Sequence, residues 1–250
     1  MRLEMDQVGP GVYQARTKYV AWVLVEDAGE VTLVDTGWPG DRQRVLRSLE
    51  EIGRRGSDVS AIVLTHGHRD HQGNAAWLHQ QYGVPVRAHA AEEANALGTR
   101  IEEVSIPTLL RMGWRPDVLV WGLDIIRLGA LTIQRVDSVD PFTDGLLDVP
   151  GQPVCVHTPG HTSGHAALHL PDRGVLLVGD ALMTQHPVGT GAQGVQLLPD
   201  YFNADTRQGA ESLERLRPLA ADVVVPGHGP AFLGTPDQAV DQALSNWSQG

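Results

Sequence analysis

Short apolar runs alternate with amphipathic stretches along most of the 250 residues of the chain. Runs rich in valine, leucine and isoleucine predict strands at 11–15, 21–25, 31–34, 61–64, 85–88, 131–136, 154–156, 166–170, 175–178 and 223–225. Apolar residues at helical spacing predict helices that begin near residues 42, 72, 90, 205 and 235. The early strands are joined by short turns and should be antiparallel, whereas later strands alternate with helices. This order predicts an α/β fold with mixed sheets.

The stretch 99–130 fits neither pattern. It is strongly apolar, but it lacks a clean strand or helix period, and Pro107 and Pro116 interrupt it. Two interpretations remain open: the stretch is an insertion folded over the rim of a site, or it completes the hydrophobic core. In the first case, Trp114 or Trp121 would contact a substrate.

A dense group of potential metal ligands follows the strand predicted at 61–64. The sequence THGHRDH, directly after it, contains three imidazoles and a carboxylate. Neutral imidazole and carboxylate are ligands that Zn²⁺ and similar metals prefer. His66 and His68, at the strand end, can bind one ion together, whereas Asp70 and His71 lie where a helix begins and face another direction. The spacing suggests two ions side by side; a His-rich surface loop or a single structural zinc is the alternative.

Four further predicted strands end in a glycine-containing turn with a carboxylate or an imidazole. In chain order these residues are Asp35, His161, Asp180 and His228. Ligands of α/β proteins gather beyond the carboxyl ends of the strands, so these turns should share one rim with the first group. Glycine lets the backbone bend sharply and approach an ion closely. One such turn is weak evidence, but five in order strongly favour a metal site.

Charge and composition narrow the function classes. The formal net charge is −11 and the isoelectric point is about 5.4, with basic residues scattered, so we expect no nucleic-acid partner. The chain begins without an apolar signal core and has no apolar run of transmembrane length, so we expect a cytoplasmic protein without a membrane partner. The one cysteine, Cys155, lies in an apolar run and should be an inert core thiol. The sequence leaves the oligomeric state open.

The ligand pattern resembles the metal-binding signature of the metallo-β-lactamase superfamily, from about Tyr19 to Pro230. The resemblance implies an α/β fold built as a four-layer αββα sandwich with mixed sheets, in a single domain of residues 1–250 with an apolar insertion at about 99–130. It also implies that Asp35 supports the ligand cluster without binding metal. The implied ligands are His66, His68 and His161 for a first metal, Asp70, His71 and His228 for a second, and Asp180 as a bridge between them.

The same resemblance implies hydrolytic chemistry. Two divalent ions, expected to be zinc with iron or manganese as alternatives, would share a hydroxide that forms near neutral pH. Asp70 would orient this hydroxide and return a proton to the leaving group. Trp38 would form a wall of the substrate site or a lid over the core. We therefore predict a metallo-hydrolase that cleaves an ester-like bond in a small-molecule substrate, with thioesters and lactones first in line.

The substrate and the function class keep alternatives. Glyoxalase II has the same ligands but adds a helical C-terminal part. Acyl-homoserine lactonases place a tyrosine shortly after the bridging aspartate, where this chain has Ala181, Leu182 and Met183. β-Lactam hydrolysis and a mononuclear iron oxygenase or other redox function are further alternatives. A non-enzymatic binding protein would be expected to lose ligands, and none is missing here.

Overall fold

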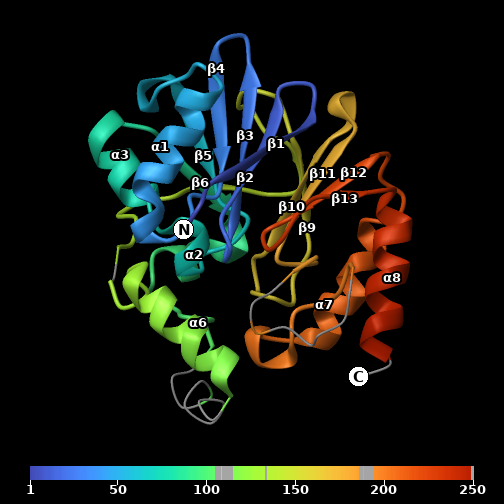
Figure 1. The fold of residues 1–250 in the computed structure, drawn as a ribbon. Coiled ribbons are helices and arrows are strands. Elements are labelled where there is room, and N and C mark those ends of the chain that lie inside the picture. Colours follow the sequence, from blue (N-terminus) through green and yellow to red (C-terminus); the bar gives the residue numbers. More distant parts are fainter. Residues whose placement is uncertain (105–107, 109–114, 133, 186–187, 189–193, 249–250) are drawn as a thin grey trace.

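Two mixed β-sheets pack face to face in the computed structural model, with helices on their outer faces (Figure 1). The structure describes residues 1–104, 108, 115–132, 134–185, 188 and 194–248. Within these ranges, strands of the first sheet lie in chain order: β1 (Glu4–Gly9), β2 (Val12–Arg16), β3 (Ala21–Asp27), β4 (Glu30–Val34), β5 (Val59–Val63), β6 (Val86–His89) and β7 (Asp140–Phe142). The strands from β1 to β4 pair antiparallel, and those from β4 to β7 pair parallel.

The second sheet has the spatial order β13–β12–β11–β10–β9–β8. Its strands are β8 (Gly145–Leu146), β9 (Val154–His157), β10 (Ala166–Leu170), β11 (Val175–Gly179), β12 (Val223–Pro226) and β13 (Phe232–Leu233). β11 pairs parallel with β12, and the other neighbours in this sheet pair antiparallel. The predicted mixed sheets and four-layer αββα arrangement are therefore confirmed.

Helices form the outer layers, with α1 and α3 beside the first sheet and α7 and α8 beside the second (Figure 1). Their bounds are α1 (Arg42–Glu51), α2 (Arg69–Gln72), α3 (Ala75–Tyr82), α4 (Glu93–Ala96), α6 (Pro116–Arg127), α7 (Thr206–Ser212) and α8 (Pro236–Ser248). Single-turn 3-10 helices are η1 (Pro39–Asp41), η2 (Gly56–Asp58), η3 (Ala90–Glu92), η4 (Pro171–Arg173), η5 (Asp200–Phe202) and η6 (Leu213–Arg215). Across the described ranges, no helix has both the length and the apolar character needed to cross a membrane.

Alternating side chains of the central strands fill three apolar layers. In β3, Trp22 packs into the layer under α1 and α3, whereas its neighbour Val23 packs between the two sheets. In β11, Leu177 packs between the sheets, and Leu176 packs into the layer that includes α7 and α8. Because both faces of these strands are buried, they appear in the sequence as continuous apolar runs without a polar face.

The sequence suggested that the stretch 99–130 is irregular, but part of it forms a regular helix. Residues 116–127 form the regular helix α6, with Pro116 in its first turn, where a missing N–H costs nothing. The buried face of α6 carries Val118, Trp121 and Ile125. Its other face carries the exposed Leu119, Val120, Leu123 and Ile126. Apolar residues on both faces hide the helical period, which explains the wrong prediction.

One strand prediction is wrong, and one of the edge strands was not predicted. No described residue of 131–136 belongs to a strand, because β7 occupies the sheet edge next to β6 and the stretch serves as its lead-in. Val136 is buried in the core, and Arg135 donates a hydrogen bond of 2.7 Å to the carbonyl of Asn95. Strand β1 was missed because it is an edge strand in which Glu4, Asp6 and Gln7 are exposed, and its apolar residues do not alternate.

Candidate metal centre

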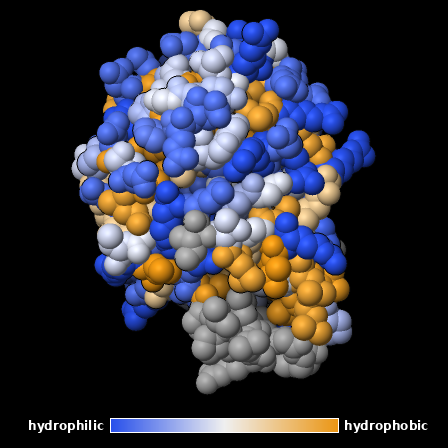
Figure 2. Space-filling model, turned by 90° about the vertical axis from the view of Figure 1, so that its left-hand side faces the viewer, coloured by the Kyte–Doolittle hydropathy of each residue, from blue (hydrophilic) through white to orange (hydrophobic). Residues whose placement is uncertain are grey.

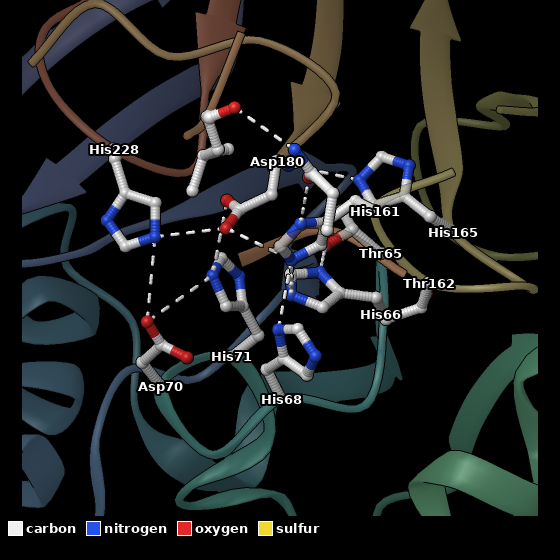
Figure 3. Close-up of polar contacts among 12 residues, drawn as sticks. Thr65, His66, His68, Asp70, His71, His161, Thr162, His165, Asp180 and His228 are labelled. Atoms are coloured by element: carbon white, nitrogen blue, oxygen red, sulfur yellow. Dashed lines mark hydrogen bonds and ion pairs between the residues drawn. The ribbon is translucent and has the colours of Figure 1, made fainter. Parts of the chain in front are cut away.

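The predicted ligands meet at one edge of the sandwich, where strands of both sheets end (Figure 3). His66 and His68 follow β5, and α2 carries Asp70 and His71. From the second sheet come His161 in the loop after β9, Asp180 directly after β11, and His228 after β12. Parallel pairing of β4 with β5, and of β11 with β12, places the carboxyl ends of these strands together.

The first group of ring nitrogens belongs to His66, His68 and His161. His161 Nε2 lies 3.2 Å from His66 Nε2 and 2.9 Å from His68 Nδ1. Zinc–nitrogen bonds of about 2.0–2.1 Å in a tetrahedron separate two ligand nitrogens by about 3.3 Å. The spacing of these three buried imidazoles therefore suits ligands of one ion.

The second group lies beside the first and consists of Asp70, His71 and His228, with Asp180 between the groups. Asp180 Oδ2 is 3.1 Å from His228 Nε2 and 3.5 Å from His161 Nε2. Its other oxygen, Oδ1, is 3.3 Å from His71 Nε2. Asp70 Oδ2 lies 3.5 Å from His228 Nε2 and 3.8 Å from His71 Nε2. Because Asp180 faces imidazoles of both groups, its position suits a ligand shared by two ions.

Four of these imidazoles are fixed by the ring nitrogen that points away from the centre. When that nitrogen donates a proton to an oxygen, the opposite nitrogen of a neutral ring keeps its lone pair for a metal. The bonds are His68 Nε2 to the Glu102 carbonyl (2.6 Å), His71 Nδ1 to Asp35 Oδ2 (2.8 Å), His161 Nδ1 to Asn203 Oδ1 (3.0 Å) and His228 Nδ1 to the Tyr19 carbonyl (2.7 Å).

Asp35 joins two of the ligand-bearing segments. Its backbone φ is 60°, in the left-handed region that residues other than glycine rarely adopt. Its Oδ1 accepts a hydrogen bond from the Thr65 amide (2.9 Å), and its Oδ2 accepts one from the Thr65 hydroxyl (2.7 Å). Asp35 thus connects the start of the His66 loop to the ring of His71. Its effect on metal binding stays a prediction.

Two buried polar atoms of the centre have no hydrogen-bond partner among the described residues, His71 Nε2 and Asp180 Oδ1. A buried, unsatisfied polar atom costs roughly 1–3 kcal/mol, and a cation between these two would satisfy both. The backbone of Gly227 packs against them so closely that a Cβ would overlap Asp180 Oδ1 and the ring of His71. Imidazole nitrogens and carboxylate oxygens are the donor set of zinc, iron and manganese sites. The residues therefore fit a metal centre.

Burial and charge set the protonation of the centre. Burial and the neighbouring imidazoles hold the pKa of His66 and of His161 well below 6.5, which keeps both rings neutral as ligation requires. Burial alone would lower the pKa of His71, but nearby carboxylates, above all Asp180, outweigh it and raise this pKa to about 10. Burial opposes ionisation of Asp180, yet the imidazoles around it, first His228, hold its pKa well below 3.8. The second group thus attracts positive charge.

Glu92 links the two ligand-bearing loops, and sequence reasoning missed it. The carboxylate is fully buried. Its Oε1 accepts hydrogen bonds from the Gly67 amide (2.7 Å) and Asn95 Nδ2 (2.6 Å). Its Oε2 accepts them from the Thr162 hydroxyl (2.7 Å) and the Gly164 amide (3.0 Å). A lone glutamate near a helix start gives no sequence signal of such a role, because most glutamates there are exposed.

His165 supports the backbone of Asp180. Its Nε2 accepts a hydrogen bond of 3.0 Å from the Asp180 amide, and its Nδ1 lies 2.9 Å from the Thr158 hydroxyl. Burial lowers the pKa of His165 to about 4, so the ring is a neutral acceptor. Cys155 is buried in the core, and burial raises the pKa of its thiol to about 12, as expected for an inert thiol.

A cavity of about 470 Å³ opens beside the ligand cluster. The candidate ligands that line it are His68, Asp70, His161, Asp180 and His228. Most of its other walls are apolar, and many of them belong to α6. Trp38 and Trp121, two of the predicted substrate contacts, line this cavity and are at the same time largely buried. The third, Trp114, lies outside the described residues.

Comparison with known sequences reveals related hydrolases. Residues 15–228 match the family described as the metallo-beta-lactamase superfamily. The chain is 30% identical over 221 residues to the probable metallo-hydrolase YflN of Bacillus subtilis (strain 168). This alignment covers 84% of this chain and 80% of that protein. It is 33% identical over 162 residues to a hydroxyacylglutathione hydrolase of Cereibacter sphaeroides (strain ATCC 17029 / ATH 2.4.9), covering 64% of this chain and 47% of that protein. The match thus spans about half the length of the latter relative.

Solved structures of similar proteins share the fold. A metallo-beta-lactamase family protein from Thermus thermophilus, TTHA1429, superposes with a TM-score of 0.67 at 30% identity over 96% of this chain and 80% of that chain. TTHA1623 in a di-iron-bound form gives a TM-score of 0.60 at 27% identity over 87% of this chain and 91% of that chain. Together with the match over residues 15–228, these similarities show that the chain belongs to the metallo-β-lactamase superfamily.

Proposed function

We propose that the protein is a metal-dependent hydrolase that cleaves an ester-like bond, a thioester or a lactone, in a small molecule. Membership of the superfamily and the relative named as a probable metallo-hydrolase support the hydrolase class. The observation that carries the proposal is the pair of adjoining ligand groups, with Asp180 between them, at the wall of an apolar cavity of about 470 Å³.

Each ligand group would hold one divalent ion. The proposed ligands are His66, His68 and His161 for the first ion, Asp70, His71 and His228 for the second, and Asp180 for both. When bound, such ions polarise a carbonyl oxygen and lower the pKa of water to near 7. We expect zinc; the di-iron form of TTHA1623 and the shared donor chemistry keep iron and manganese as alternatives.

Asp70 is the residue to which we assign the proton transfer. Its Oδ2 faces the ring nitrogens of His228 and His71, while its side chain also lines the cavity and is 17% exposed. Its other oxygen can accept a hydrogen bond from an attacking water and carry that proton to the leaving group. General acid–base assistance of this kind contributes roughly 10²–10⁴-fold to a rate.

Thioesters and lactones are the first substrate classes to test. The relative from Cereibacter sphaeroides is, by its name, a hydrolase of a glutathione thioester. A mononuclear iron oxygenase would leave the second ligand group without a purpose, although Asp70, His71 and His228 all face the centre. β-Lactam hydrolysis is the remaining hydrolytic alternative, and the same assay distinguishes it.

A substrate panel tests the proposed function. The metal-loaded protein is assayed with acyl thioesters, γ-lactones, β-lactams and phosphodiesters, beside Asp70→Ala and the control Asp172→Asn. Asp172 is an exposed carboxylate in η4, before the start of β11, whereas the candidate centre lies beyond the end of that strand. We expect hydrolysis of thioesters or lactones, a loss of at least roughly 100-fold in Asp70→Ala, and no change in the control. Turnover of β-lactams or phosphodiesters alone, or full activity of Asp70→Ala, would contradict the proposal.

A further inference from the structure

We propose that the substrate carries an aliphatic chain, and that this chain binds along helix α6 while the reacting carbonyl faces the candidate metal ligands. The inference rests on the proposed function and adds the chemical class of the acyl group. It follows from the composition of the cavity, from the charges that line it, and from the bonds that fix α6 to the ligand-bearing segments.

Helix α6 packs on the core and also presents apolar side chains to the cavity. Leu119, Leu123 and Ile126 line the cavity although they are 54%, 57% and 49% exposed. Val118 and Ile125 line it from the buried side of the same helix. Figure 2 shows hydrophobic side chains gathered at the end of the molecule where α6 lies. Exposed aliphatic residues on a helix that borders a site are a binding surface for apolar ligands.

The cavity offers little to a charged or strongly polar substituent. Among the described residues that line it, Arg69 is the one lysine or arginine. Its guanidinium is already engaged, with Nε 3.1 Å from Glu103 Oε2 and a bond of 2.5 Å to the carbonyl of Ala130. Away from the candidate metal ligands, an anionic substituent such as a phosphate or a carboxylate would therefore meet Glu103 without a free lysine or arginine to bind it. The lining thus favours a hydrocarbon over an anionic group.

Helix α6 is also fixed relative to the candidate ligands. The Tyr19 hydroxyl donates a hydrogen bond of 2.6 Å to Asp124 on α6, and the Tyr19 carbonyl accepts one of 2.7 Å from His228 Nδ1. One turn further along the chain, the Gly40 amide donates a hydrogen bond of 2.8 Å to the carbonyl of Leu128, the residue that follows α6. These bonds hold the apolar wall in a fixed position relative to the candidate metal ligands. A chain attached to the reacting carbonyl can therefore extend along α6. A cavity of about 470 Å³ is within the size range of small-molecule sites.

Chain-length dependence of hydrolysis is the first test. The metal-loaded protein is assayed with p-nitrophenyl esters from acetate to decanoate. Each added methylene that leaves water should raise kcat/KM roughly fourfold until the wall is covered. Leu123→Ser should lower the octanoate-to-acetate ratio of kcat/KM roughly tenfold, because it replaces part of the wall with a hydroxyl. Leu146→Ser is the matched control, since Leu146 is 66% exposed on β8 and does not line the cavity.

Binding of n-alkanols, from butanol to decanol, tests the same surface without turnover. Trp38 and Trp121 line the cavity, so tryptophan fluorescence of the metal-loaded protein reports occupancy. We expect the affinity to rise with chain length, and to rise less steeply in Leu123→Ser than in Leu146→Ser. If alkanols bind with this length dependence but no thioester or lactone of the substrate panel is hydrolysed, the proposed function fails and the chain site stands.

Three results would overturn the chain site. The first is a value of kcat/KM that does not depend on acyl length. The second is alkanol affinity that does not increase with length. The third is a wild-type dimer that Leu123→Ser converts to a monomer, measured by light scattering, with an unchanged length dependence; the apolar face of α6 would then be an interface between copies of the chain.

Discussion

Replacing Glu92 with glutamine tests whether the centre depends on the link between its two loops. Glu92 accepts four hydrogen bonds, two on each carboxylate oxygen. In Glu92→Gln the amide NH₂ must face two donors on one side, so two bonds to a charged acceptor are lost. Each such bond is worth roughly 1.5–3 kcal/mol. Burial raises the pKa of Glu92, so removal of the charge offsets part of this loss.

The expected net destabilisation of Glu92→Gln is about 2–4 kcal/mol, which lowers Tm by roughly 4–16 °C in a chain of this size. Because Gly67 and Thr162 belong to loops that carry candidate ligands, zinc affinity should also fall roughly 10–100-fold, as it does when groups that orient metal ligands are removed. Thermal unfolding measures the first effect. Competition with a chelator of known zinc affinity measures the second, below the melting transition of the variant.

Glu93→Gln is the matched control for this experiment. Glu93 is the next residue in the chain, and the described structure shows no hydrogen bond from its side chain to either ligand loop. The control should keep both the wild-type Tm and the wild-type zinc affinity. If Glu92→Gln loses stability but keeps zinc affinity within about twofold, a positioning role for Glu92 is refuted. If it loses neither, the estimate of the hydrogen bonds themselves is wrong.

Three further predictions concern single residues. Asp35→Asn should weaken zinc affinity roughly 10–100-fold, because its carboxylate holds the ring of His71; a wild-type affinity by chelator competition would contradict this. Gly227→Ala should prevent normal metal loading, since its Cβ overlaps Asp180 Oδ1; full metal content by elemental analysis would oppose the packing argument. Cys155 has a pKa raised to about 12, so at pH 8–10 the native protein should not react with iodoacetamide, whereas the urea-unfolded chain should react faster as pH rises; rapid labelling of the native protein would show that the thiol is accessible.

The strand ends and the ligand residues could be predicted from the sequence because their signals are local. An apolar run bounded by a glycine turn marks a buried strand, and an imidazole or carboxylate at that turn stands out against its neighbours. His161, Asp180 and His228 are far apart in the sequence, yet each follows such a run, and the structure brings them to one edge of the sandwich. The parallel pairing of β11 with β12 is the physical reason that separate turns converge.

Features that depend on tertiary contacts left no such signal. Helix α6 is apolar on both faces, because one face packs on the core and the other borders the cavity, and so its period was hidden. The role of Glu92 arises from two loops whose residues are 95 positions apart at Gly67 and Thr162, and no local pattern connects them. The alternation at 131–136 resembles a strand, but the edge beside β6 is occupied by β7. A strand needs a partner, which a single segment of sequence does not reveal.

Metal titration of the metal-free protein tests the central claim most directly. Zinc is added in steps to the wild-type protein and to Asp180→Ala, and bound metal and hydrolysis of a thioester or lactone are measured on the same samples. The account predicts that activity rises to a maximum at two equivalents of zinc per chain, and that Asp180→Ala binds less metal and stays inactive, because Asp180 lies between both ligand groups. Full activity at one equivalent, or an Asp180→Ala protein that turns over like the wild type, would contradict the two-metal hydrolase.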